Sequence, residues 1–162
     1  MTYFPFIWKG ETSLAHELTM PFRELSLHLR WSLWEPSSLT LRRNNGSDII
    51  IYSQMHDVAE RLEVGILTFE LVTAHSTPEN DRVIALFKEF DAPITASKLL
   101  ISESENTLES GIILKAANGS QIIIVAGVSP YTIAIQGVAD NLPRIFNPEY
   151  PLEDYKIIPM IY

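Results

Sequence analysis

The chain has 162 residues, of which 46% are hydrophobic and 20% charged, a composition typical of one globular domain with a sizeable core. It contains no cysteine, so disulfides, thiolate metal sites and cysteine nucleophiles are excluded. The N-terminus has no basic segment before its apolar residues, and no later apolar run is long enough to span a membrane. We therefore expect a cytoplasmic protein without a signal peptide.

The formal net charge of −8 is unevenly distributed. Residues 1–45 carry five basic and four acidic side chains, whereas residues 46–162 carry seven basic and sixteen acidic ones. An acidic surface repels phosphate backbones and anionic membranes, so we expect neither nucleic acid nor membrane as a partner. Such a surface attracts basic proteins, although its charge can also serve solubility alone.

The first segments of the chain predict an arm and a short helix. Residues 1–11 are rich in aromatic side chains and contain Pro5, which favours an edge strand or an irregular arm packed on the core. Residues 12–20 are compatible with one or two helical turns capped by Thr12 or Ser13.

Residues 24–34 alternate leucine or tryptophan with mostly polar residues, and this period of two predicts a strand with one face in the core. The other face carries His28, Arg30 and Trp34, a combination typical of a binding surface. The alternative is that the N-terminal arm or the proline-rich C-terminal tail covers Trp34.

Two β-hairpins are predicted, each reversing at an Asn-Gly pair between apolar strands. They span residues 38–52 and 111–126. With a two-residue type I′ turn, Leu41 faces Ile50 in the first hairpin and Leu114 faces Ile123 in the second. Both turns also match the Asn-x-Ser glycosylation pattern, but turn chemistry accounts for them.

The two hairpins match each other at an offset of 73 residues, with seven identities in thirteen positions. An internal duplication would produce this match, and so would the common requirement of an Asn-Gly turn between β-forming residues. The sequence leaves both explanations open.

The segment between the hairpins predicts a strand and a helix. In the strand at 62–72, the apolar positions change parity near Gly65, which indicates a bulge or a passage between two packing environments. An amphipathic helix is predicted at about 77–90, with Thr77 as cap, Pro78 in the first position and an apolar stripe laid against a sheet.

The remaining predicted elements are short. They are a strand at 98–102, a solvated acidic loop at 103–110, a strand at 131–137, a wrapping tail from residue 140, and a final edge strand at 157–161. The fold class is therefore α+β and mainly β: a single domain over residues 1–162, with about eight strands in antiparallel hairpins arranged as two β units. The sequence leaves open whether these units form a sandwich, a barrel or a curved sheet.

No motif for catalysis or metal binding is present. The four histidines lack metal-ligand spacing, no Gly-x-Ser-x-Gly elbow occurs, and no glycine-rich loop precedes the expected helix, so we expect neither metal nor cofactor. The pair His56-Asp57 is expected in a loop.

The function that these observations favour is a non-enzymatic, cytoplasmic protein-interaction module that masks a basic partner. The expected binding residues are His28, Arg30 and Trp34, with a second, acidic patch of Glu103, Glu105 and Glu109. One alternative is a small-molecule-binding or hydrolytic domain with a pocket between sheet and helix, using His28 or His56 as acid or base. Another is a structural homodimer joined through a strand edge.

Overall fold

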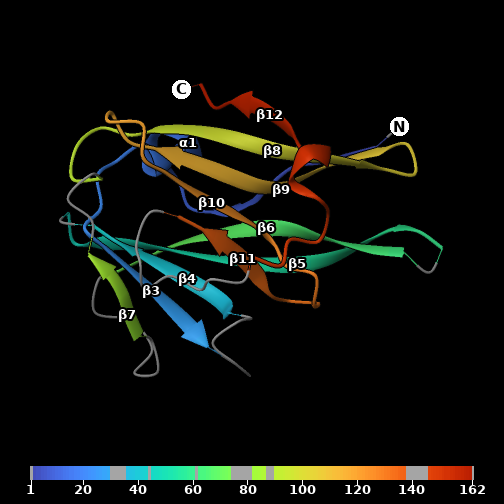
Figure 1. The fold of residues 1–162 in the computed structure, drawn as a ribbon, viewed down its shortest axis with the longest axis horizontal. Helices are drawn as coiled ribbons and strands as arrows, with labels where there is room; N and C mark the ends of the chain where they lie inside the picture. The colour runs from blue at the N-terminus through green and yellow to red at the C-terminus, as the bar shows by residue number, and fades with distance from the viewer. Residues whose placement is uncertain are drawn as a thin grey trace.

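The computed structural model describes residues 2–29, 36–43, 45–60, 62–73, 82–86, 90–137 and 146–161. Its strands form two mainly antiparallel sheets, which Figure 1 shows as two layers. The N-terminal sheet has the order β2-β6-β5-β4-β3-β7, and the C-terminal sheet has the order β11-β10-β9-β8-β12 with β1 beside β9. The expected mainly β fold with two β units is confirmed.

The N-terminal sheet contains β2 (Ile7–Lys9), β3 (Glu24–Leu29), β4 (Pro36–Arg42), β5 (Ser47–Ala59), β6 (Leu62–Thr73) and β7 (Arg82–Leu86). The C-terminal sheet contains β1 (Tyr3–Phe4), β8 (Thr95–Glu103), β9 (Asn106–Lys115), β10 (Gln121–Ala126), β11 (Ile133–Gln136) and β12 (Lys156–Pro159). Outside the sheets are the helix α1 (Leu14–Leu18) and the 3-10 turn η1 (Leu152–Asp154).

The N-terminal arm, the short helix and the final edge strand predicted from the sequence are confirmed, whereas residues 140–145 of the predicted tail lie outside the described residues. The aromatic arm forms β1 and β2, each of which pairs in parallel with a longer strand. The helix α1 begins after Ser13, whose side chain accepts a hydrogen bond from the His16 N–H at 3.3 Å. Near the C-terminus, β12 pairs with β8 at the edge of its sheet.

The two sheets repeat one topology. In each, four consecutive strands form a meander, and a fifth strand pairs with the first strand of that meander: β3 to β6 with β7, and β8 to β11 with β12. The 73-residue offset places β4 on β9 and β5 on β10. A common turn requirement explains two similar hairpins but not five strands in the same order, so the topology favours the internal duplication.

Both Asn-Gly hairpins form, but their predicted register is wrong by one residue. Leu41 faces Ile49, and Leu114 faces Ile122. The second hairpin has a three-residue loop closed by Ala116 and Ser120, in which only Gly119 has a positive φ, of 91°. In such a loop a type I turn is followed by one left-handed residue, so Asn118 keeps a negative φ and its side chain accepts the Ser120 N–H at 2.9 Å.

The helix predicted at about 77–90 is wrong where the structure describes it. Residues 82–86 form β7, which pairs antiparallel with β3, while residues 77–81 and 87–89 lie outside the described residues. The apolar spacing suits a helix, but β3 offers a row of unpaired backbone groups that a strand satisfies. Phe90, expected on the helix, is fully buried and stacks on Phe22 with 5.1 Å between the ring centroids.

The loop predicted at 103–110 is also wrong. A hairpin forms instead, in which Ser104 and Glu105 connect β8 to β9. Both residues have positive φ angles, 49° and 67°, so the two-residue turn expected at the Asn-Gly pairs occurs here without glycine.

Two hydrophobic clusters explain why apolar positions in β6 change parity. Leu67 and Phe69 pack in the cluster between the sheets, with Ile49 and Ile122, whereas Ile66 packs with Ile123 in a second cluster. The ladder between β5 and β6 continues unbroken past Gly65, and its irregularity lies between Asp57 and Ala59. The bulge expected near Gly65 is therefore wrong, and the passage between two packing environments is confirmed.

Candidate functional site

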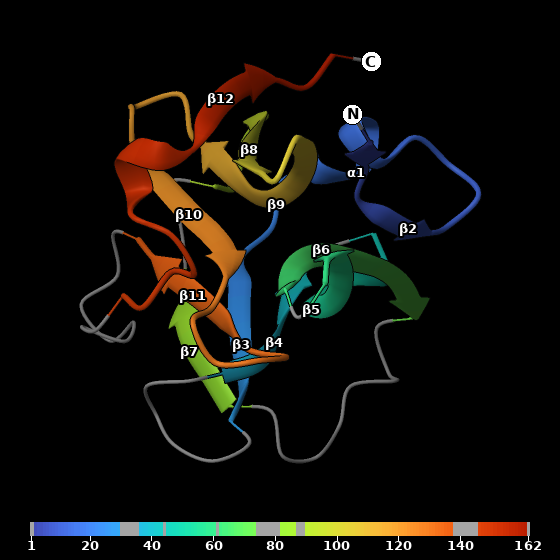
Figure 2. The ribbon, with the colours of Figure 1, turned by 90° about the vertical axis from the view of Figure 1, so that its right-hand side faces the viewer.

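Two hairpin ends lie side by side at one end of the molecule, on the right in Figure 1 and toward the viewer in Figure 2. One hairpin joins β5 to β6, and the other joins β8 to β9. The Asn106 side-chain amide on β9 donates a hydrogen bond to the Val58 carbonyl oxygen on β5 at 2.8 Å. The C-terminal tail supports the same end, because the Tyr150 hydroxyl donates to the Glu103 carboxylate at 3.0 Å.

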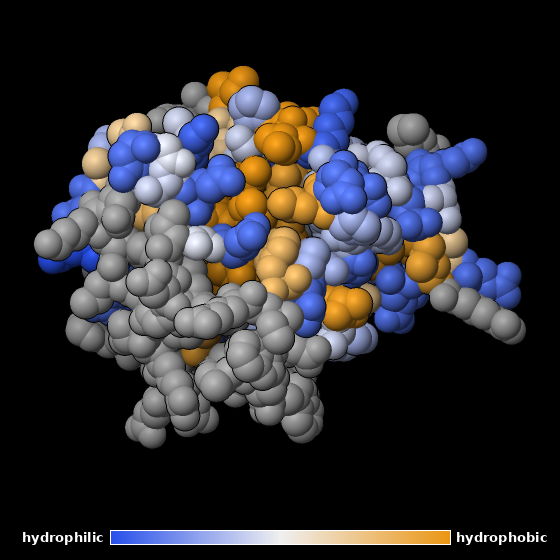
Figure 3. All heavy atoms as spheres, in the orientation of Figure 1, coloured by the Kyte–Doolittle hydropathy of each residue, from blue (hydrophilic) through white to orange (hydrophobic). Residues whose placement is uncertain are grey.

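This end carries a concentration of carboxylates, which we call the acidic end. Its members are Asp57, Glu60, Glu63 and Glu105, all exposed, and Glu103, which is partly buried. Asp57 stands directly opposite Glu63 in the ladder between β5 and β6. Like charges in such a pair destabilise a sheet, so this arrangement does not serve the fold. Hydrophilic residues dominate the same end of the surface in Figure 3.

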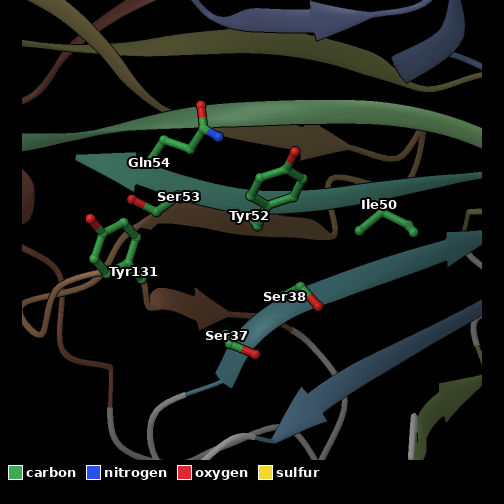
Figure 4. Close-up of a pocket in the computed structure, with 7 residues that line it drawn as sticks. All are labelled: Ser37, Ser38, Ile50, Tyr52, Ser53, Gln54 and Tyr131. Atoms are coloured by element: carbon green, nitrogen blue, oxygen red, sulfur yellow. The ribbon is translucent and has the colours of Figure 1, made fainter. Parts of the chain in front are cut away.

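A groove begins where β4 and β5 separate. The two strands pair up to Ser38 opposite Tyr52, and beyond that point β5 continues beside β6. The groove has a volume of about 370 Å³, and the loop between β10 and β11 borders it (Figure 4). It is lined by Ser37, Ser38, Ile50, Tyr52, Ser53, Gln54 and Tyr131. Its hydroxyl and amide groups suit a neutral, hydrogen-bonding ligand, and none of these side chains is charged.

Two tyrosines shape the groove. Tyr131 is 53% exposed and has a φ of 61°, a conformation that costs a non-glycine residue on the order of 1 kcal/mol or more. Its loop is held by the Gly127 N–H, which donates to the Thr132 carbonyl oxygen at 2.8 Å. The Tyr52 hydroxyl donates to Glu70 at 3.1 Å and accepts from Lys9 Nζ at 3.0 Å, so its ring is fixed at the groove wall.

A half-buried carboxylate lies between the two hairpins and the tail. Both oxygens of Glu149 accept the Gly65 N–H, at 3.1 and 3.2 Å, and the Gly65 carbonyl oxygen accepts the Ser110 hydroxyl at 2.8 Å. Burial, and then the nearby charge of Glu103, raise the pKa of Glu149 to about 7, although the Gly65 hydrogen bond acts in the opposite direction. The tail is thereby attached to β6 through a group that titrates near neutral pH.

The structure divides the binding residues predicted from the sequence. Glu103 and Glu105 lie together at the acidic end, on either side of the start of the β8–β9 turn. His28 is half-buried on β3 in the N-terminal sheet, whereas Glu103 and Glu105 belong to the β8–β9 hairpin of the C-terminal sheet. The predicted Arg30 and Trp34 lie outside the described residues.

Glu109 does not belong to the surface patch, and that part of the prediction is wrong. Its side chain is only 1% exposed and binds three donors: the Tyr3 hydroxyl at 2.5 Å, Lys98 Nζ at 2.5 Å and the Phe6 N–H at 2.7 Å. Burial and the hydrogen bond to Glu109 raise the pKa of the Tyr3 phenol to about 12. Glu109 therefore fastens the N-terminal arm to the C-terminal sheet.

The polar pair His56-Asp57 lies on β5 rather than in the expected loop. His56 packs beside Phe4, with 6.2 Å between the ring centroids, and its Nε2 is buried without a hydrogen-bond partner. Asp57 is exposed and points to the opposite face of the strand. Across the described ranges, no group of three or more His, Asp or Glu side chains is placed to hold a metal ion.

Comparisons with protein-family models, with curated proteins and with solved structures gave no match to this chain. The site is therefore interpreted from its own geometry. The helix in the described part of the chain is too short to cross a membrane.

Three members of the acidic end were not predicted from the sequence: Asp57, Glu60 and Glu63. The sequence does contain a signal for them, because Asp57 and Glu63 lie on either side of the turn that follows Ala59. If β5 and β6 pair up to this turn, the two carboxylates stand opposite each other. That inference requires β5 to continue past Tyr52, and the mixed composition of residues 53–59 did not predict this.

Proposed function

We propose that this protein is a non-enzymatic interaction module that binds a basic protein partner through its acidic end. The observation that carries the proposal is the direct apposition of Asp57 and Glu63, with Glu60 between them in the chain and Glu105 on the neighbouring hairpin. Carboxylates held together against their mutual repulsion lose that repulsion when a cationic surface covers them. The partner is basic for the same reason.

The rest of the molecule supports a binding role. The acidic end is built on two long hairpins that the Asn106 hydrogen bond joins, so the carboxylates are held in place before a partner arrives. The adjoining groove is lined by neutral hydrogen-bonding groups, which bind and orient a ligand but lack the acid–base pair of a hydrolytic site. The expected pocket between sheet and helix is not supported, because β7 occupies the central part of the predicted helix.

Charge reversal at matched positions tests the proposal. The probe is a fluorescein-labelled decalysine peptide, and its binding is followed by fluorescence anisotropy at low and at physiological salt. The test variant is the double substitution Glu60→Lys with Glu63→Lys. The control is Glu11→Lys with Asp91→Lys, which changes the net charge equally at exposed positions on other segments.

We expect the test variant to bind the probe about tenfold more weakly than the wild type and the control variant to stay close to wild type. Equal weakening in both variants would show that the probe senses only net charge, and the proposal would be rejected. Absence of wild-type binding at low salt would also reject it.

A second candidate function, binding of a small neutral molecule, is favoured by the size and lining of the groove. It predicts that neutral sugars or nucleosides raise the melting temperature of the wild type but not of Tyr131→Ala. No such shift is expected if the groove serves a protein partner.

A further inference from the structure

The strand β5 extends well beyond its partner β4. It runs from Ser47 to Ala59, but β4 pairs with it only as far as Tyr52. From Ser53 onward β5 pairs with β6 on one side, and no strand of the described residues pairs with it on the other. Within the described ranges, one edge of β5 therefore lacks a partner strand between the groove and the acidic end, and we call it the open edge.

The direction of the peptide groups along this edge follows from Gly65. Its N–H and C=O point away from β5, because they bind Glu149 and Ser110. In an antiparallel ladder the residue opposite behaves in the same way, so the peptide groups of Met55 point away from β6. The period of two extends this to Ser53 and Asp57. Ser53 is buried at 3% exposure, so Met55 and Asp57 are the two residues whose N–H and C=O groups face an accessible part of this edge.

The opposite edge of the same hairpin is covered. Along β6, the strand β2 pairs with residues 68–70, and Ser110 and Glu149 bind both backbone groups of Gly65. The β6 edge of the hairpin is therefore occupied at Gly65 and at residues 68–70, whereas the β5 edge past Tyr52 has no partner strand among the described residues.

Resting on the proposed function, we propose that the open edge of β5, at Met55 and Asp57, binds an extended segment of the basic partner as an added β-strand. Backbone hydrogen bonds to the edge hold such a segment, and its cationic side chains reach the carboxylates at the acidic end. At the other end of the edge, the groove with Tyr131 receives a side chain of the segment.

Charge selects this occupant over a second copy of the chain. Antiparallel pairing of two β5 edges would direct the acidic ends of the two copies to opposite ends of the paired edge, so neither end would be covered by cations of a β5 strand. Each copy also carries a formal net charge of −8, so association of two copies adds like-charge repulsion. A basic segment instead places cationic side chains beside the carboxylates, so charge favours an extended cationic partner.

The first test uses peptide backbone chemistry on the wild-type protein. The probe is a labelled octapeptide of alternating lysine and valine, compared with the same peptide N-methylated at every second amide, in each of the two possible phases. Methylation removes donors from one edge of the peptide and keeps its charge. We expect at least one phase to bind about tenfold more weakly than the unmethylated peptide.

Amide hydrogen exchange gives the second readout. In the free protein, the N–H groups of Met55 and Asp57 are expected to exchange faster than those of Gln54 and His56, which face β6. Addition of the unmethylated peptide is expected to slow exchange at Met55 and Asp57. No change at these two amides would overturn the inference.

The outcomes separate this inference from the proposed function. If all three peptides bind equally and Glu60→Lys with Glu63→Lys weakens them all, the acidic end binds cations but strand addition is overturned. If none of the peptides binds, both ideas fail. If the protein dimerises in sedimentation and Met55→Pro abolishes the dimer, the edge belongs to a second copy and the inference is overturned.

The variant Met55→Pro is designed to remove only an edge donor, because the Met55 N–H does not take part in the β6 ladder. We expect it to fold and to bind the unmethylated peptide about tenfold more weakly. The methylated peptides make the same test on the unaltered protein.

Discussion

The buried carboxylate of Glu109 allows a quantitative test, because sequence and structure assign it opposite roles. As a surface acid, Glu109 could be replaced by alanine with a change in the free energy of unfolding within about 0.5 kcal/mol. In the structure it is 1% exposed and holds the Tyr3 hydroxyl, Lys98 Nζ and the Phe6 N–H. Truncation of this side chain leaves three donors without their acceptor.

The magnitude depends on which donors can reach water. The Lys98 side chain is 30% exposed and Tyr3 is 50% exposed, so both can be partly solvated after the change. Phe6 is 9% exposed, and its N–H loses its acceptor in a buried position, at a cost of about 1–3 kcal/mol. We therefore expect Glu109→Ala to lower the free energy of unfolding by about 3 kcal/mol, the low end of the range for a broken buried ion pair. For a chain of this length the melting temperature falls by about 10 °C.

Urea unfolding followed by tryptophan fluorescence measures this loss, with Glu63→Ala as the matched control. Glu63 is an exposed strand acid opposite Asp57, so its removal should leave stability unchanged or slightly raise it. A double-mutant cycle with Lys98→Met should give a coupling energy of about 1 kcal/mol, because that lysine is partly solvated. A loss below about 1 kcal/mol for Glu109→Ala would refute the assignment of Glu109 as a buried anchor.

Three further predictions concern the supports of the acidic end. Burial raises the pKa of Glu149 from 4.5 in the unfolded chain to about 7 in the folded chain, so between these pH values the folded state binds more protons than the unfolded state. The free energy of unfolding should therefore fall as the pH rises from about 4.5 to 7. Melting temperatures of Glu149→Gln, measured across this pH range, should lack the fall that Glu149 causes. Gly65→Ala should destabilise by about 1–3 kcal/mol in urea unfolding, because the new Cβ would lie 2.6 Å from the Ala126 Cβ. Ser104→Asn with Glu105→Gly should raise the free energy of unfolding by about 1 kcal/mol, because Asn-Gly accepts two positive φ angles; the measurement is a higher urea midpoint.

The hairpins were predictable, but their register was not. Asn-Gly between apolar strands suits a two-residue turn with two positive φ angles and equally a three-residue turn with one. A slip of one residue exchanges the two faces of a strand, and a polar face would normally reveal it. In β10, Ile122, Ile123, Ile124 and Val125 are all buried, so the hydrophobic pattern accepts either register.

The two failed element predictions have a common cause. Residues 77–90 have helical spacing and residues 103–110 have the composition of a loop, yet residues 82–86 form a strand and residues 103–110 form two strands joined by a two-residue turn. Local patterns report what a segment prefers in isolation, whereas β3 and β8 each provide backbone partners for a neighbouring strand. Glu109 illustrates the consequence, because a carboxylate in an acidic stretch became the most buried acid of that stretch.

The candidate site could be predicted only in part, because it is made by contacts between distant segments. Glu103 and Glu105 were expected as acids of one patch, but their neighbours on β5 and β6 are 40 or more residues away in the chain. The two hairpins meet through the Asn106 hydrogen bond to Val58, which no local pattern encodes. The parity change in β6 did signal that this hairpin enters a second packing environment.

The contrast between the two edges of the β5–β6 hairpin links the fold to the proposed function. On β6, the chain uses a strand, a serine and a carboxylate with a raised pKa to occupy the edge, even though burial of Glu149 costs stability at neutral pH. On β5, no comparable cover lies on Met55 and Asp57 among the described residues, and the flanking carboxylates repel one another. Folding alone would favour covering both edges and dispersing the charge. A requirement to receive a cationic strand accounts for both the uncovered β5 edge and the clustered carboxylates. Slower amide exchange at Met55 and Asp57 after addition of the basic peptide would distinguish this requirement from charge that serves solubility only.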